Sequence, residues 1–180
     1  MSKYIINAFK HFRKICIHKY WVFHYCWRAG IPVQGLMHDL SKFSPTEFFE
    51  SVKYYQGTSS PIEACKKANG WSAAWLHHKG RNKHHYEYWQ DNFDNGTVHL
   101  EMPMKYKKEM LCDFLGAGRA YYGKSFSYEK ELNWWKVKTS RPLAMNKNDI
   151  AFIEKYMNLL CEYENKGNIK EVFNLIKKEK

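Results

Sequence analysis

Histidine is the residue type whose placement in this sequence most clearly suggests chemistry. Nine histidines occur among 180 residues. One of them, His38, directly precedes Asp39, and four more form two neighbouring pairs, His77-His78 and His84-His85. Imidazole nitrogens and carboxylate oxygens are ligands that Zn, Fe, Mn and related ions accept, and a carboxylate can bridge two ions. These residues therefore indicate a metal site.

A lysine accompanies the His38-Asp39 pair. Lys42 stands three residues after Asp39 and four after His38, so on a helix the three side chains reach the same side. A cation beside a metal site suits a phosphate group. Further along, Lys79, Arg81 and Asn82 lie between the histidine pairs. We expect these residues to contact a phosphate, with surface charge and, for Asn82, a helix cap as the alternatives.

Two more residues extend the candidate site. Asp113 lies in an apolar stretch, where a buried carboxylate must be paired or coordinated. Glu109, one turn earlier, shares its helix face. His18 precedes His38 by 20 residues, a length sufficient for a helix, a turn and a return. The chain can therefore bring His18 back towards His38, and Asp113, if buried, needs a cation or a metal as partner.

The ordered set His18, His38-Asp39, two histidine pairs and Asp113 resembles the HD-domain superfamily of metal-dependent phosphohydrolases. Three blocks are more closely similar to a bacterial and phage family within that superfamily, catalogued as a domain of unknown function. They are GLMHDLSKFSPTEF (35–48), SAAWLHHKGRNKHHYEYW (72–89) and MPMKYKKEMLCDF (102–114). The similarity extends from about residue 10 to residue 125.

The resemblance implies residue roles. A first metal site would consist of His18, His38, Asp39 and Asp113, and Asp39 would bridge to a second. One histidine of each pair would complete that second site, with His78, His84 and His85 as candidates. One or two divalent ions are implied: Mn, Fe, Co, Ni or Zn, with Mg as an alternative. Two-metal relatives separate their extra histidines by a longer segment, so the choice within each pair stays open.

The expected function is hydrolysis of a phosphate ester in a nucleotide or a nucleotide-derived signal, linear or cyclic. A metal-activated water would attack phosphorus, with Asp39, Lys42 and a proton-donating His77 as catalytic residues. Three alternatives belong to other classes. They are a di-iron oxygenase of the HD type acting on a small polar substrate, a nuclease or nucleic-acid binder suggested by the net charge of +11, and an interaction module without catalysis.

Helices must position these residues, since clean strand alternation is absent. Apolar residues at steps of three and four, from Ile5 to Phe23, predict an amphipathic helix over 3–28. The capping box Ser44-Pro45-Thr46-Glu47 predicts a helix start. Further helices are expected after Ser60, over 71–79, 83–91, 103–122, 128–138 and 147–165, and after Gly167, with a loop over 92–102. We predict an all-α, single-domain bundle of the HD type, with a metal-binding core over 1–125 and a helical extension over 126–180 packed on it.

Composition limits the protein class. With 44% hydrophobic and 17% aromatic residues the chain is unlike a disordered protein. No window of 18 apolar residues is present, and the charged residues that interrupt the first apolar runs argue against a signal peptide. Five scattered cysteines without CxxC suggest reduced thiols, so we expect a cytoplasmic protein. We expect a phosphate-bearing small molecule as partner, nucleic acid as a second candidate and no membrane; the oligomeric state is undetermined. The tryptophans and tyrosines near the histidines and at 134–135 form either core or a base-stacking surface.

Overall fold

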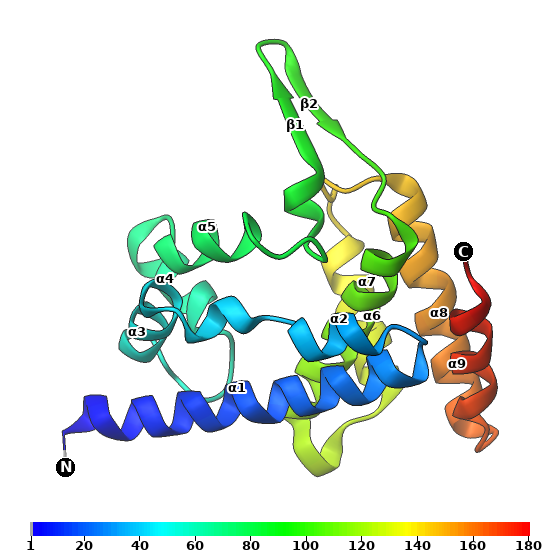
Figure 1. Cartoon of the computed structure of the whole chain (residues 1–180), viewed down its shortest axis with the longest axis horizontal. Helices are drawn as coiled ribbons and strands as arrows, with labels where there is room; N and C mark the ends of the chain where they lie inside the picture. Colours follow the sequence, from blue (N-terminus) through cyan, green and yellow to red (C-terminus); the bar gives the residue numbers. More distant parts are fainter. Residues whose placement is uncertain (1) are drawn as a thin grey trace.

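A computed structural model describes residues 2–180, which form nine α-helices, three short 3-10 helices and one hairpin of two strands (Figure 1). The protein is therefore mostly helical. The α-helices are α1 (Lys3–Arg28), α2 (Pro32–Met37), α3 (Pro45–Lys53), α4 (Pro61–Asn69), α5 (Ala73–Lys79), α6 (Met104–Tyr122), α7 (Tyr128–Thr139), α8 (Lys147–Asn165) and α9 (Ile169–Lys178). The shorter elements are η1 (Leu40–Phe43), η2 (Tyr86–Trp89), β1 (Gln90–Phe93), β2 (Gly96–His99) and η3 (Gly123–Ser125).

Local capping determines where the helices near the site begin. The Ser44 hydroxyl accepts a hydrogen bond from the Glu47 backbone N–H at 3.4 Å, and Pro45 occupies the first turn of α3, as the capping box predicts. Ser72 caps α5 in the same way, accepting from the Trp75 N–H at 3.0 Å. Since both caps involve neighbouring residues, the sequence alone is sufficient to specify them.

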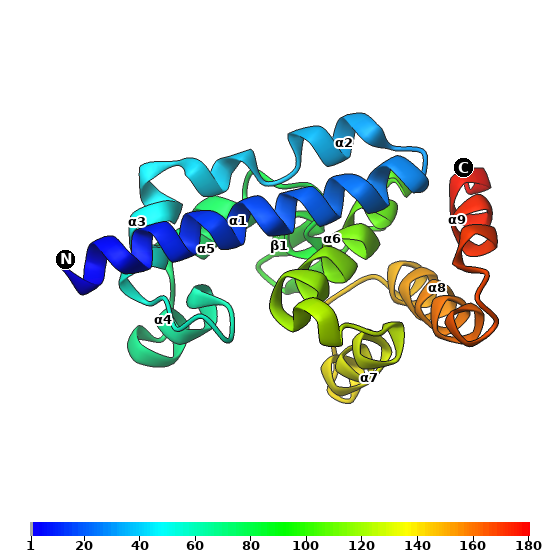
Figure 2. The same cartoon turned by 90° about the horizontal axis from the view of Figure 1, so that it is seen from below.

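Helix α1 lies across α6, and this crossing is the centre of the molecule (Figure 2). A Cβ on Gly116 of α6 would lie 2.4 Å from Val22 Cγ2, so only glycine permits this close approach. One hydrophobic core continues from this crossing into the C-terminal helices, through Trp135 of α7, Ile153 of α8 and Phe173 of α9. Residues after 125 thus pack on the same core as α1 and α6.

The apolar stripe predicted on residues 3–28 faces outward. Phe9 is 69% exposed and Tyr20 is 62% exposed. The helix instead buries a face that contains His11, His18 and Val22. Periodicity correctly predicted the helix, but two histidines lie on its buried side.

The predicted helical fold class is confirmed in its main feature, to which the structure adds a hairpin of two short strands. The helix predicted over 83–91 is wrong, because a turn, η2 and the start of β1 occupy these residues. Strand β1 pairs antiparallel with β2, from Gln90 opposite His99 to Phe93 opposite Gly96. It projects away from the helices (Figure 1). Nearly all its side chains are exposed, so it lacks the alternation of apolar and polar residues by which a half-buried strand is recognised. The Asn95-Gly96 pair, from which a loop over 92–102 was predicted, lies where the turn between the two strands ends and β2 begins.

Within residues 2–180, none of the helices combines the length and the apolar character needed to cross a membrane.

Candidate metal centre

Four segments that are distant in the sequence meet at Asp39. His18 comes from the inner face of α1, Asp113 from α6 and His78 from α5, while His38-Asp39 forms the junction between α2 and η1. A Cβ on Gly35 of α2 would lie 2.6 Å from Cys26 Cβ, so glycine lets α2 return closely along α1. The backbone of Asp39 has a φ of 53°, the only left-handed non-glycine conformation among the described residues. Such strained conformations concentrate at functional sites.

The first group of candidate ligands lies on the Oδ2 side of Asp39. The His38 Nε2 atom is 3.2 Å from Asp39 Oδ2 and 3.4 Å from Asp113 Oδ1. The His18 Nε2 atom is 3.6 Å from Asp39 Oδ2 and 3.1 Å from Asp113 Oδ1. These four ligand atoms lie within 4.8 Å of one another, a spacing that permits one metal ion to bind them all.

The second group lies on the Oδ1 side of the same carboxylate. His78 Nε2 is 3.3 Å and His84 Nε2 is 3.4 Å from Asp39 Oδ1. The His85 Nε2 atom lies 2.8 Å from that of His78. These residues form another set of ligand atoms within 4.8 Å. Asp39 therefore presents one oxygen to each group, which is the geometry of a bridging carboxylate.

Two further carboxylates hold the histidines from behind. Glu109 Oε1 is 3.0 Å from His38 Nδ1 and 3.2 Å from His84 Nδ1. Glu47 Oε2 accepts a hydrogen bond from His78 Nδ1 at 2.7 Å. A carboxylate only accepts, so each Nδ1 carries the proton in these pairs and each Nε2 is directed at Asp39. This carboxylate–histidine arrangement orients imidazole ligands in metal sites.

The electrostatics match a cation-binding centre. Burial alone would raise the pKa of Asp39, but the positive charges of His38, Lys42 and His78 hold it well below its usual range. Burial opposes a charge on His38, yet Asp39, Asp113 and Glu109 outweigh it and hold the pKa of His38 well above its usual value. The buried carboxylates of Asp39, Glu109 and Asp113 therefore stay ionised and favour positive charge beside them.

Buried atoms without partners test whether these residues fit a metal. Asp39 is 1% exposed; Lys42 forms an ion pair with its Oδ2 atom, but neither carboxylate oxygen accepts a hydrogen bond of good geometry. His84, also 1% exposed, has an unpartnered Nε2 atom. Unsatisfied polar atoms are costly inside a protein. A divalent ion coordinated by these atoms would satisfy them, so the residues fit a metal.

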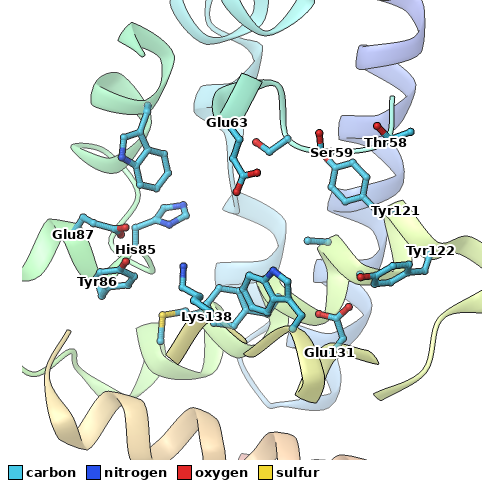
Figure 3. Close-up of a pocket in the computed structure, with 17 residues that line it drawn as sticks. Thr58, Ser59, Glu63, His85, Tyr86, Glu87, Tyr121, Tyr122, Glu131 and Lys138 are labelled. Atoms are coloured by element: carbon cyan, nitrogen blue, oxygen red, sulfur yellow. The ribbon is translucent and has the colours of Figure 1, made fainter. Parts of the chain in front are cut away.

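A cavity of about 200 Å³ opens onto the centre. His18, Asp113 and Lys42 line it, together with His78 and His85. The Lys42 ammonium lies 2.5 Å from Asp39 Oδ2, so the cation that follows the His38-Asp39 pair does reach the site. A second cavity of about 400 Å³ adjoins the first (Figure 3).

The other expected site residues lie outside these two cavities. His77 does not line either one, and its Nδ1 donates to Glu47 Oε1 at 2.7 Å. Lys79 and Arg81 also line neither cavity. The amide of Asn82 donates to Ser41 Oγ and to the His78 carbonyl, both at 2.8 Å, so it holds the chain that bears the histidines.

Sequence reasoning missed three residues of the site. Glu47 was assigned only a capping role, and its contact with His78 spans 31 positions of sequence. Glu109 had a usable signal, its position one turn before Asp113, but its contact with His38 spans 71 positions. His11 lines the cavity with a buried, unpartnered Nδ1; burial and nearby Lys42 lower its pKa to about 4.

Comparison with known proteins identifies the family of this chain but no activity. The model of a family of unknown function, DUF5662, matches residues 7–159. No curated protein and no solved structure matches the chain.

Proposed function

We propose that this chain, a member of the DUF5662 family of unknown function, is a metal-dependent phosphohydrolase of the HD-domain type. Because the family supplies no activity, the proposal is inferred from the groups around Asp39. One observation carries this proposal. The two buried oxygens of Asp39 face two separate ligand groups, and the Lys42 ammonium stands beside them at the cavity. Two cation positions and a lysine at one opening suit a dianionic phosphate better than a neutral substrate.

The ligands would divide between two ions. His18, His38 and Asp113 would hold the first and His78, His84 and His85 the second, with Asp39 shared. Mixed nitrogen and oxygen donors favour Mn, Fe, Co, Ni or Zn, with Mg as a weaker candidate. When bound, such ions supply Lewis-acid chemistry: they lower the pKa of water at the site and neutralise charge on phosphoryl oxygens.

The chain's own side chains would perform the remaining tasks. Lys42 stays protonated, because the Asp39 and Asp113 carboxylates outweigh its burial and raise its pKa. Its ammonium would contact the phosphate oxygens and stabilise the charge that accumulates there. His11 is neutral near pH 7 and would offer a hydrogen bond from the cavity wall. His77 would have to rotate away from Glu47 to reach a leaving group, so we no longer favour it as the proton donor.

The substrate would be a phosphate ester in a nucleotide, either a monoester or a linear or cyclic diester. The cavity beside the histidines has room for a phosphate group, and the adjoining cavity has room for the organic part. The 200 Å³ space is narrow, which favours a small molecule over a nucleic-acid strand.

The test is a screen of nucleoside phosphates and cyclic dinucleotides with Mn, Mg, Co, Ni or Zn added. Asp39→Ala should lose nearly all turnover, whereas Asp91→Ala, a change on the exposed hairpin, should retain it. Circular dichroism checks that both variants fold. If no phosphate ester is hydrolysed with any metal, or if Asp39→Ala is as active as the wild type, the proposal fails.

A second experiment addresses a di-iron oxygenase, which could use this ligand set. Protein purified without oxygen is analysed for metal content and by electron paramagnetic resonance. A mixed-valent iron signal together with absent phosphate release would replace the hydrolase proposal with the oxygenase.

A further inference from the structure

The cavity of Figure 3 is joined to the metal centre through shared walls. Trp75, His85 and Tyr121 line both this cavity and the smaller one beside Asp39. The larger cavity holds about 400 Å³, which lies within the range of pockets that accept small organic molecules. A phosphate at the histidines would therefore place the organic part of its ester here.

Aromatic side chains form much of this cavity. The rings belong to Trp75, Tyr86, Phe114, Tyr121 and Trp134, from four separate parts of the chain. Rings from several directions bind a flat ring by stacking and edge contacts. For Trp75, Tyr86 and Trp134 the sequence allowed two interpretations, packing in the core or stacking on a base. Their position in the wall of this cavity favours stacking.

Three carboxyl groups line the cavity wall, those of Glu63, Glu87 and Glu131. Glu131 of α7 is 4% exposed, and burial raises its pKa to about 7, with no hydrogen bond or charge as a further cause. A Cβ on Gly118 would lie 1.9 Å from Glu131 Oε1, so the absence of a side chain on α6 makes room for this group. Burying an unpaired carboxyl destabilises a protein, whereas a ligand that donates a hydrogen bond to it would recover that energy.

A lysine on the same helix narrows the ligand class. Lys138 and Glu131 both extend from α7 into the cavity (Figure 3). The Lys138 ammonium lies 5.6 Å from the centre of the Tyr86 ring and 5.5 Å from that of Trp134. The wall therefore holds one cation beside the carboxyl groups of Glu63, Glu87 and Glu131. A neutral ring with both a hydrogen-bond donor and an acceptor fits a wall that offers both partners.

We propose that this cavity binds an amino-bearing nucleobase, with Glu131 accepting a hydrogen bond from the exocyclic amino group. Adenine and cytosine present this donor–acceptor edge, whereas hypoxanthine and uracil present a carbonyl oxygen in place of the amino group. Glu131 is thus a specificity-determining residue. This inference rests on the proposed function, which places the phosphate beside the histidines, and it adds where the base would bind.

Calorimetric titration with nucleosides tests the inference without any phosphate chemistry. The probes are adenosine, inosine, cytidine and uridine, with choline as the organic cation. Wild type should bind adenosine over inosine, and cytidine over uridine, by about tenfold or more, since one good base contact discriminates by about 1–3 kcal/mol. Glu131→Gln should bring these ratios close to one, because an amide can either accept or donate. Glu129→Gln, an exposed change on the same helix, should preserve them.

The outcomes separate this inference from the hydrolase proposal. Equal binding of all four nucleosides, no saturable binding of any, stronger binding of choline, or unchanged ratios in Glu131→Gln would overturn the inference. The predicted ratios in a protein that hydrolyses no phosphate ester would support the base site and reject only the hydrolase. Thermal melting shows whether Glu131→Gln is folded, and the isosteric change keeps the cavity filled.

Discussion

Replacing Glu109 by glutamine should weaken metal binding at both ligand groups. The carboxylate faces His38 Nδ1 at 3.0 Å and His84 Nδ1 at 3.2 Å, and these histidines belong to different groups. Glutamine has nearly the same shape but no charge. Both imidazoles therefore lose the carboxylate that holds the proton on Nδ1 and directs Nε2 toward Asp39.

The size of the effect follows from these contacts. A hydrogen bond to a charged group contributes about 1.5–3 kcal/mol, and loss of a carboxylate behind a metal-bound histidine lowers affinity about 10- to 100-fold. We expect a loss in this range at each group in Glu109→Gln. Glu47 contacts His78 but neither His18 nor His38, so Glu47→Gln should weaken only the second group.

Equilibrium dialysis of metal-depleted protein against buffered Mn²⁺, with bound metal counted by mass spectrometry, measures both affinities. Glu129→Gln is the control, since Glu129 is exposed and distant from the ligand groups. Unchanged affinity in Glu109→Gln would refute the assigned role. Equal losses at both groups in Glu47→Gln would refute the separation into two sites.

Three further predictions concern charge and packing. Lys42→Met should lower turnover of a phosphate ester at least about tenfold without lowering Mn²⁺ affinity, because it removes a cation that competes for Asp39 Oδ2; a matching loss of metal would contradict this. Burial raises the pKa of Glu131 from 4.5 to about 7, so the folded state holds its proton more tightly. Wild type should therefore lose stability relative to Glu131→Gln as pH rises through this interval, by at most about 3 kcal/mol in urea denaturation, and a pH-independent difference would exclude the shift. Gly116→Ala should destabilise the fold by about 1–3 kcal/mol in the same assay, because its Cβ would meet Val22; an unchanged midpoint would show that α1 and α6 can separate freely.

Much of the fold was predictable because its signals are local. Capping at Ser44, the helix over 103–122 and the break after Arg28 depend on neighbouring residues and appear in the structure within a few positions. The hairpin was missed because its strands are exposed and show no apolar alternation. The outward stripe on α1 shows the limit of periodicity, which identifies a helix but not the face that packs inward.

The candidate ligands were predicted from residue type, their order in the chain and the resemblance to HD-domain proteins. His38 and Asp39 are neighbours, the histidine pairs are adjacent, and Asp113 stands out in an apolar helix. The structure brings all seven candidate ligands into two groups that share Asp39. The predicted phosphate contacts of Lys79 and Arg81 had less support, because a charged residue next to a histidine in sequence need not face the same cavity. Neither residue lines one of the two cavities.

Local spacing and side-chain chemistry specify the helical elements and the types of the candidate ligands. Tertiary packing specifies which oxygen of Asp39 faces which histidines, that Glu47 and Glu109 orient them, and that Glu131 is buried beside Gly118. These facts depend on contacts between residues far apart in the chain. Such contacts form where α1, α5, α6 and α7 pack, and no local pattern encodes that packing.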